Sequence, residues 1–149
     1  HTRSVAVTGV QTCALPISVR HAILRAGKPI ESCHFEGDEL ASTHHFGYYL
    51  ATELIGVISL FEAKNTAFGE QKSFQIRGMA VLTNHQRKGI GEALVSAAES
   101  FCKKQETTLI WFNARTSAVG FYQKMGYEIS GSEFEIQGVG PHFLMHKKI

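Results

Sequence analysis

The chain has 149 residues, of which 44% are hydrophobic and 19% are charged, a composition typical of one globular domain with its own core. Its net charge of +2 is too small to indicate a nucleic-acid partner. No apolar run approaches the roughly 20 residues that span a bilayer. The three cysteines lack paired spacing, and no HExxH motif occurs among the eight histidines. We therefore expect a cytoplasmic protein without nucleic-acid, membrane or metal partners.

The first eighteen residues, HTRSVAVTGVQTCALPIS, have no clear hydrophobic period, and polar residues and Pro16 interrupt any signal-peptide pattern. Within them, residues 7–17 resemble the in-frame translation of a common sequencing adapter. We expect residues 1–18 to be non-native, and residues 19–149 to form one domain whose first strand is truncated. Residues 4–8 would be a poor substitute for that strand.

Residues 19–26 predict a short amphipathic helix, with Arg20 and Arg25 away from its apolar side. Residues 29–43 are polar and predict a loop with one helical turn, of a length that often borders a binding site.

Residues 44–50 and 54–61 are rich in aromatic and β-branched side chains and predict an antiparallel hairpin. Residues 74–82 predict a third strand, in which Gly78 indicates a bulge or a close backbone approach.

Residues 89–105 show the clearest helical period in the chain, and residues 107–113 have the composition of a buried strand. A strand–helix–strand succession predicts a parallel or mixed sheet. A second helix is expected at 117–125, capped by Ser or Thr and ended by Gly126. Short strands or a closing hairpin are expected at 127–130, 133–137 and 142–148.

The turn at residues 86–91, QRKGIG, places two cations and two glycines at the start of the clearest helix. Unpaired N–H groups and the positive end of the helix dipole favour an anion there. A dinucleotide fingerprint would need a third glycine where Leu94 stands, and the Walker pattern is absent. The turn therefore predicts a phosphate site, although an ordinary helix entry with solvated Arg87 and Lys88 remains an alternative on spacing alone.

Three motifs together carry a family resemblance. They are Arg77-Gly-Met-Ala-Val, the QRKGIG turn, and N-A-R-x-x-A-x-x-F-Y-x-x-x-G-Y from Asn113 to Tyr127. Their order and separation resemble the acetyl-CoA-binding core of the GNAT superfamily of N-acyltransferases, from about Leu54 to the C-terminus. The segments GDE, THHFG and GVGPHFLM resemble a branch of small bacterial members.

The resemblance implies an α/β (α+β) fold with a GNAT-like mixed, mostly antiparallel central sheet flanked by helices, in which a splayed strand pair holds CoA. It implies that the backbone of Met79, Ala80 and Val81 pairs with the pantetheine arm of acetyl-CoA. The pyrophosphate would lie on the turn, and Asn113 would bond the pantetheine amide. The full set of implied cofactor residues is Met79, Ala80, Val81, Gln86, Arg87, Lys88, Gly89, Ile90, Gly91, Asn113, Ala118, Phe121 and Lys124.

Tyr122 resembles the tyrosine that many members use as a general acid to protonate the departing CoA thiolate. A phenol of pKa about 10 can protonate a developing base at close range. Without the motif, Tyr122 would be interpreted as a core aromatic.

The implied reaction transfers acetyl directly to a primary amine of a small molecule or peptide. No base is singled out, because direct transfer needs only a neutral amine and a water-mediated proton route suffices. The acceptor-side candidates are Asp38, Glu39, His45 and His142, and the two histidines also have a structural interpretation. An acyl-CoA-binding or regulatory module without turnover is the alternative function, and a homodimer is left open.

Overall fold

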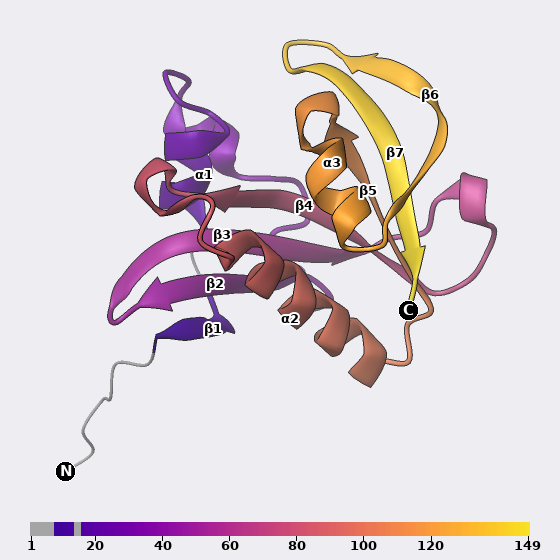
Figure 1. The fold of residues 1–149 in the computed structure, drawn as a ribbon, viewed down its shortest axis with the longest axis horizontal. Coiled ribbons are helices and arrows are strands. Elements are labelled where there is room, and N and C mark those ends of the chain that lie inside the picture. The colour runs from indigo at the N-terminus through magenta and orange to yellow at the C-terminus, as the bar shows by residue number, and fades with distance from the viewer. Residues whose placement is uncertain (1–7, 14–15) are drawn as a thin grey trace. The chain divides into compact units, whose positions relative to one another are not determined.

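The structure, a computed structural model, describes residues 8–13 and 16–149. The strands and helices of this part of the chain are labelled in Figure 1. They are β1 (Gly9–Thr12), α1 (Ile17–Ile23), β2 (His44–Leu50), β3 (Glu53–Glu62), β4 (Ser73–Val81), α2 (Ile90–Lys104), β5 (Leu109–Arg115), α3 (Val119–Lys124), β6 (Glu128–Ile136) and β7 (Gly140–Lys148). Among these described helices, none is long and apolar enough to cross a membrane.

The strands form one mixed sheet in the order β1-β2-β3-β4-β5-β7-β6. The hairpin of β2 and β3 is antiparallel, as are the pairs β1–β2, β5–β7 and β6–β7. Strands β4 and β5 are parallel and are joined through α2, with residues 73–75 opposite 109–111. The predicted mixed, mostly antiparallel sheet is confirmed.

The described residues fall into two compact units. The first contains the chain up to Phe61 together with Gly78–Ala98, and the second contains Glu62–Arg77 and Glu99–Ile149.

Strand β3 is the centre of the first unit because it is buried on both faces. Val57 lies in a buried cluster with Cys13, Val19 and Ala80. At the preceding residue, a side chain added to Gly56 would meet Leu94 of α2 at 3.1 Å, on the opposite face. Burial of both faces explains the nearly continuous apolar run of this strand.

Strand β1 lies within the segment that we expected to be non-native. It pairs with β2, with Gly9 opposite Tyr49 and Thr12 opposite Phe46. Cys13 follows it and is 5% exposed. Residues 4–7 of the expected substitute strand lie outside the described residues. The pairing leaves the origin of residues 1–18 untested.

The second unit is built around aromatic rings. The ring centroid of Phe112 on β5 lies 4.3 Å from that of Tyr122 on α3 and 5.0 Å from that of Tyr127. The Tyr127 hydroxyl donates to Glu99 at 2.9 Å, and Lys147 donates to the same carboxylate at 3.1 Å. Gly126 ends α3 at φ +93°, as the sequence predicts.

The first helix lies at Ile17–Ile23 rather than at the predicted 19–26. Two other predicted elements differ in more than the position of their ends. The expected strands at 127–130 and 133–137 are one strand, β6, with a register irregularity between Ser130 and Phe134. Gly131, at φ +83°, lies in this irregularity, which accommodates the polar residues that had suggested a turn. The expected helix at 117–125 begins as the 3₁₀ turn Thr116–Ala118, and α3 has no side-chain cap.

Gly78 has the close approach that the sequence predicts. Its φ is +66°, and an added Cβ would lie 2.9 Å from the Phe35 ring and 3.1 Å from Arg20 Nε. Both strain and collision therefore oppose any side chain at this position.

We predict that Gly78→Ala lowers the free energy of unfolding by about 2–4 kcal/mol, because a left-handed backbone and a tight contact both disfavour the methyl group. Urea unfolding of wild type and variant measures the loss. Gly131→Ala is the matched control, because its φ of +83° is equally unfavourable but nothing lies within 4 Å of an added Cβ. An equal loss in the two variants would show that the contact with Phe35 and Arg20 contributes nothing.

Candidate active site

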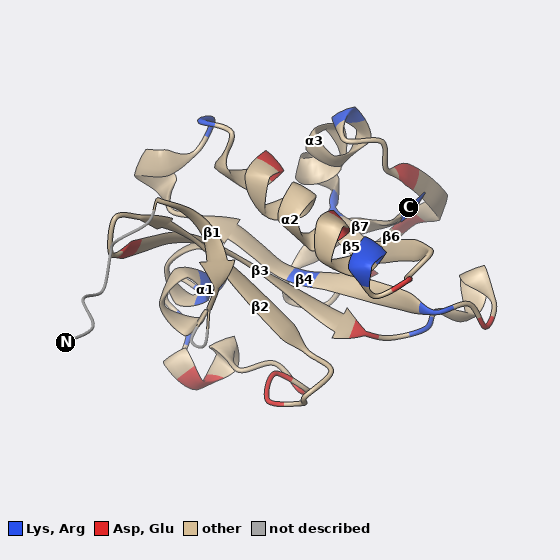
Figure 2. Cartoon of the chain, turned by 90° about the horizontal axis from the view of Figure 1, so that it is seen from below, with Lys and Arg blue, Asp and Glu red and all other residues tan. Residues whose placement is uncertain are grey.

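The basic turn before α2 has an unusual backbone. Arg87 and Gly89 both have positive φ, at 63° and 81°, and Lys88 lies between them. The carbonyl of Gly89 accepts the first helical hydrogen bond, from Ala93 N–H at 3.1 Å, so the N–H groups ahead of Ala93 face the turn without a helical partner. Backbone N–H groups left free at a helix start are a type of group that can bind an anion, and the basic residues of the turn precede α2 in Figure 2.

The side chain of Gln86 connects this turn to β4. Its Nε2 donates to the Val81 carbonyl at 2.9 Å, which ties the turn to the end of β4. Ala80 and Val81 are 4% and 8% exposed, and Met79 is half-buried. A ligand at the C-terminal end of β4 would therefore contact the backbone rather than these side chains.

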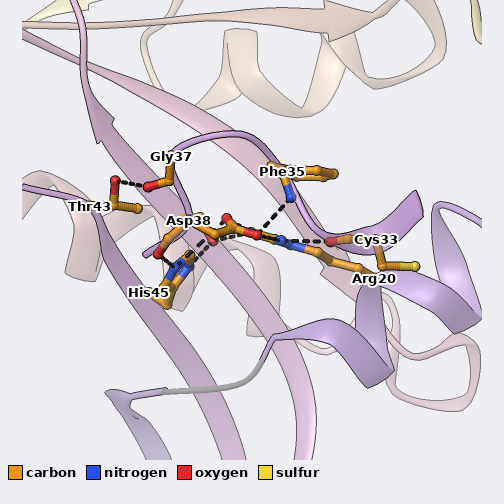
Figure 3. A network of polar contacts seen from close by, with 8 residues as sticks. Arg20, Cys33, Phe35, Gly37, Asp38, Thr43 and His45 are labelled. Carbon is orange, nitrogen blue, oxygen red and sulfur yellow. Dashed lines mark hydrogen bonds and ion pairs between the residues drawn. The ribbon is translucent and has the colours of Figure 1, made fainter. Parts of the chain in front are cut away.

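A buried cation is the main polar feature of the first unit (Figure 3). Arg20 on α1 is 0% exposed. Its two terminal nitrogens bind the carboxylate of Asp38 at 2.7 and 3.0 Å. They also donate to the Cys33 carbonyl and the Ser59 hydroxyl, each at 2.9 Å, while the guanidinium lies 3.9 Å from the centre of the Phe35 ring. This network joins α1, the 30–43 loop and β3.

The sequence prediction for Arg20 was wrong, since it placed this side chain with Arg25 away from the apolar side of the helix. Arg20 is instead among the most buried side chains of the described chain. Its partner Asp38 lies 18 positions away, so no local pattern distinguishes the buried Arg20 from the half-buried Arg25. The Asp38 carboxylate, predicted as an acceptor-side residue, is occupied by this ion pair.

The ring of His45 is engaged at both nitrogens. Nε2 lies 2.9 Å from the Asp38 backbone carbonyl, which can only accept, so this nitrogen carries hydrogen. Nδ1 lies 2.6 Å from the Ser59 hydroxyl, which already accepts from Arg20. Both ring nitrogens of His45 therefore have hydrogen-bond partners. Glu39, the neighbouring candidate, is exposed on the loop.

Tyr122 is buried in the second unit, with 6% of its surface exposed. Its neighbours are Phe112, Phe121 and Tyr127, with ring centroids 4.3, 5.0 and 6.1 Å away. Burial raises its pKa above the ordinary value of 10.0, so the phenol is protonated at neutral pH. This state suits a general acid, and the packing equally suits a core aromatic.

The remaining predicted residues of the second unit have different surroundings. Asn113 is exposed near the end of β5, and Lys124 is exposed on α3, while Ala118 and Phe121 are half-buried. His142 is 4% exposed, and its Nδ1 lies 2.7 Å from the Gly140 carbonyl. The structure thus groups Asn113 and the predicted α3 residues with His142. It groups the turn with the other three acceptor-side candidates in the first unit.

Comparison with known proteins identifies the fold and the family. The family model for the acetyltransferase (GNAT) domain matches residues 30–149. The chain belongs to the GNAT family. It is 30% identical over 131 residues to the uncharacterized N-acetyltransferase YitI of Bacillus subtilis (strain 168), and the match covers 88% of each chain. It is thus a member of a family of acetyl-CoA-dependent N-acetyltransferases.

Solved GNAT structures share the fold at low sequence identity. A protein from Lactobacillus plantarum is 18% identical with a TM-score of 0.78, over 95% of this chain and 98% of that one. An aminoglycoside 6'-N-acetyltransferase complexed with coenzyme A is 15% identical with a TM-score of 0.72, over 93% and 96%. A family member from Elizabethkingia anophelis with acetyl-CoA bound is 16% identical with a TM-score of 0.67, over 94% and 97%.

We predict that Asp38→Asn destabilises the protein by about 3 kcal/mol at pH 7, because it leaves the buried Arg20 charge unpaired. Burial raises the pKa of Asp38, but the hydrogen bonds from Arg20 and Phe35 and the charges of Arg20 and His45 outweigh it and lower the pKa below 3.8. A lowered pKa means that the carboxylate stabilises the fold above its ordinary pKa, and that this stability is lost as the pH falls through the folded value.

The difference between wild type and Asp38→Asn should therefore shrink on acidification to about pH 3, where the wild-type carboxyl is increasingly protonated. Urea unfolding at both pH values measures it. Glu36→Gln, an exposed acidic residue on the same loop, should change stability by less than about 0.5 kcal/mol at either pH. A pH-independent difference for Asp38→Asn would contradict the assigned ion pair.

Proposed function

We propose that the protein transfers an acetyl group from acetyl-CoA directly to a primary amine of a small molecule or peptide. The observation that carries this proposal is the turn at Arg87–Lys88–Gly89 ahead of α2, within a chain that the GNAT domain model matches over residues 30–149. Membership of the family supports the reaction class, and the turn supports the cofactor, because its backbone suits a pyrophosphate.

Acetyl-CoA would bind mainly through backbone groups. Met79, Ala80 and Val81 would pair with pantetheine as an added strand, with the Val81 carbonyl shared with Gln86. The turn would bind the pyrophosphate, with Arg87 and Lys88 adding screened attraction. The complete proposed set is Met79, Ala80, Val81, Gln86, Arg87, Lys88, Gly89, Ile90, Gly91, Asn113, Ala118, Phe121 and Lys124.

Asn113 would bond the pantetheine amide, and its exposure on β5 supports this role. Ala118, Phe121 and Lys124 would line or rim the distal part of CoA. Tyr122 would protonate the departing thiolate, and its protonated state at neutral pH supports that role.

The hydrogen bonds of the acceptor-side residues suggest different roles for them. Asp38 and His45 would act by holding the 30–43 loop against α1 and β3, since their polar atoms are engaged in the Arg20 network. Glu39, on the same loop, would attract a cationic amine from its exposed position. His142 differs from these residues, because its Nδ1 lies 2.7 Å from the Gly140 carbonyl and no other hydrogen bond of its side chain is found within the part of the chain that the structure describes.

Three further proposals concern the protein in its cell. We propose a cytoplasmic enzyme without nucleic-acid or membrane partners, and a homodimer is compatible with it. Residues 1–18 would be of foreign origin, joined to a domain at 19–149. Sequencing the coding DNA tests this last point, because codons unlike those of an adapter would remove the reason for it.

Thiol release from acetyl-CoA across a panel of primary amines tests the proposed function. We expect free CoA to form in proportion to one or more amines, with a mass increase of one acetyl group on the acceptor. Binding of acetyl-CoA without amine-dependent release would instead favour an acyl-CoA-binding module without turnover. The panel should include diamines, amino acids and peptide N-termini, because the turn binds the cofactor and does not select the acceptor.

We predict that Tyr122→Phe lowers kcat about 100-fold with the best amine, because a positioned general acid contributes on this scale. KM for acetyl-CoA should change little, since the ring and its packing are retained. The unfolding free energies of the wild type and Tyr122→Phe are compared, and equal values would show that the packing is retained. Full kcat for Tyr122→Phe across the pH range would leave Tyr122 as a core aromatic.

A further inference from the structure

Gly78 bends β4 immediately before the segment that we propose to bind pantetheine. Its φ of +66° lies in the left-handed region, inside a strand that runs from Ser73 to Val81. Residues 79–81 follow it directly. A left-handed glycine within a strand changes the direction of the residues that come after it. The conformation at Gly78 therefore sets the direction in which the backbone of residues 79–81 points.

Two side chains from elsewhere in the first unit lie against this bend. A Cβ added at Gly78 would lie 2.9 Å from Cε2 of Phe35 and 3.1 Å from Nε of Arg20. Arg20 lies on α1 and Phe35 on the 30–43 loop, and the guanidinium lies 3.9 Å from the centre of the ring (Figure 3). Together they fill the space that a side chain at position 78 would need. The backbone of Gly78 therefore cannot move toward them.

The Nε atom of Arg20 shows that this contact is unfavourable by itself. Arg20 is 0% exposed, and Nε is one of two buried side-chain atoms that have no hydrogen-bond partner in the described part of the chain. A buried N–H without a hydrogen bond has lost its hydration with nothing in exchange. Local costs of this kind persist where the surrounding structure fixes the group, and they are concentrated at functional sites. Here the unbonded N–H lies beside the bend of β4.

Asp38 fixes both groups that lie against Gly78. Its carboxylate accepts from the two terminal nitrogens of Arg20 at 2.7 and 3.0 Å. The same carboxylate accepts from the backbone N–H of Phe35 at 2.8 Å. The guanidinium and the backbone of Phe35 therefore cannot leave the bend without breaking a hydrogen bond to a carboxylate whose side chain is only 12% exposed.

The rest of the segment is held independently of Gly78. At its far end, the Val81 carbonyl accepts from Gln86 Nε2 at 2.9 Å. In its middle, Ala80 lies in one buried cluster with Val19 of α1. Since the middle and the far end have their own contacts, the bend at Gly78 is the part of the segment whose position depends on Arg20 and its partners.

We propose that Arg20 is a positioning residue for acetyl-CoA, an inference that rests on the function proposed above. Its guanidinium and the Phe35 ring keep Gly78 in the left-handed bend. The bend in turn presents the backbone of Met79–Val81 to pantetheine in the geometry of an added strand. Arg20 acts through Gly78 and does not itself contact the cofactor. Asp38, which lies on a loop where the sequence suggested acceptor contacts, acts on the donor side by holding Arg20 and Phe35.

The experiment measures the dissociation constant of CoA by isothermal titration calorimetry, with circular dichroism to show that each variant is folded. We expect Arg20→Lys to raise the dissociation constant about tenfold, because lysine keeps the charge beside Asp38 but lacks the planar guanidinium that packs on Phe35. Phe35→Leu leaves the ion pair intact and should raise it by a similar factor. This second variant provides the test if Arg20→Lys does not fold. Unchanged CoA affinity in the folded variants would overturn the proposal.

Ser59→Ala is the matched control. The Ser59 hydroxyl accepts from a terminal nitrogen of Arg20 at 2.9 Å, but Ser59 is not among the nearest neighbours of Gly78. The substitution should lower the free energy of unfolding and leave the dissociation constant of CoA within about twofold of the wild-type value. A rise as large as that of Arg20→Lys would overturn the proposal, because any weakening of the network would then be sufficient.

A double-mutant cycle tests the contact at Gly78 itself. Gly78→Ala should also weaken CoA binding. Its effect and that of Phe35→Leu should be non-additive, because both substitutions disturb one contact. Additive effects on the dissociation constant would overturn the assigned route through Gly78.

Failure of the proposed function gives a different result. A wild-type protein that binds no CoA, or that releases no thiol in the presence of amines, would reject the function and the positioning role with it. Failure of the positioning role alone leaves wild-type binding and turnover intact, and removes only the difference between Ser59→Ala and the variants of Arg20 and Phe35.

Discussion

The ion pair between Arg20 and Asp38 is the interaction on which the first unit depends. One guanidinium binds a carboxylate, a backbone carbonyl and a hydroxyl, while its face covers Phe35. A buried cation is costly unless its partners surround it. The first unit is therefore stable only when α1, the 30–43 loop and β3 are packed together. Phe35 and Arg20 leave no room for a side chain at Gly78. This position lies on β4, the strand that leads into the basic turn.

The same network changes how the acceptor-side residues are interpreted. An acidic residue and a histidine on a long polar loop first suggest substrate contacts. In the structure, the Asp38 carboxylate and both nitrogens of His45 have partners, whereas His142 keeps one nitrogen free. Candidate bases with similar sequence signals thus differ in whether a lone pair is available.

Much of the fold follows from local patterns. Strand β2 begins and ends at the predicted residues, α2 follows its helical period, and the glycine at 126 ends α3. The prediction for β6 failed because a bulge carries its polar residues within one strand, and no short-range pattern distinguishes such a bulge from a turn. Arg20 was assigned to the wrong environment, because burial of an arginine depends on a carboxylate distant in the sequence.

The sequence alone determined the order of most strands and helices, the basic turn that suits a pyrophosphate, and the motifs that indicate a GNAT acetyltransferase. These depend on periodicity and on residue types at short spacing, which are local properties of a chain. Only the tertiary structure decided that Arg20 is the buried centre of the first unit, that Asp38 and His45 are already bonded, and that His142 presents Nε2. Those properties depend on which distant atoms meet a given side chain, and hydrogen bonding between them exists only once the chain has folded.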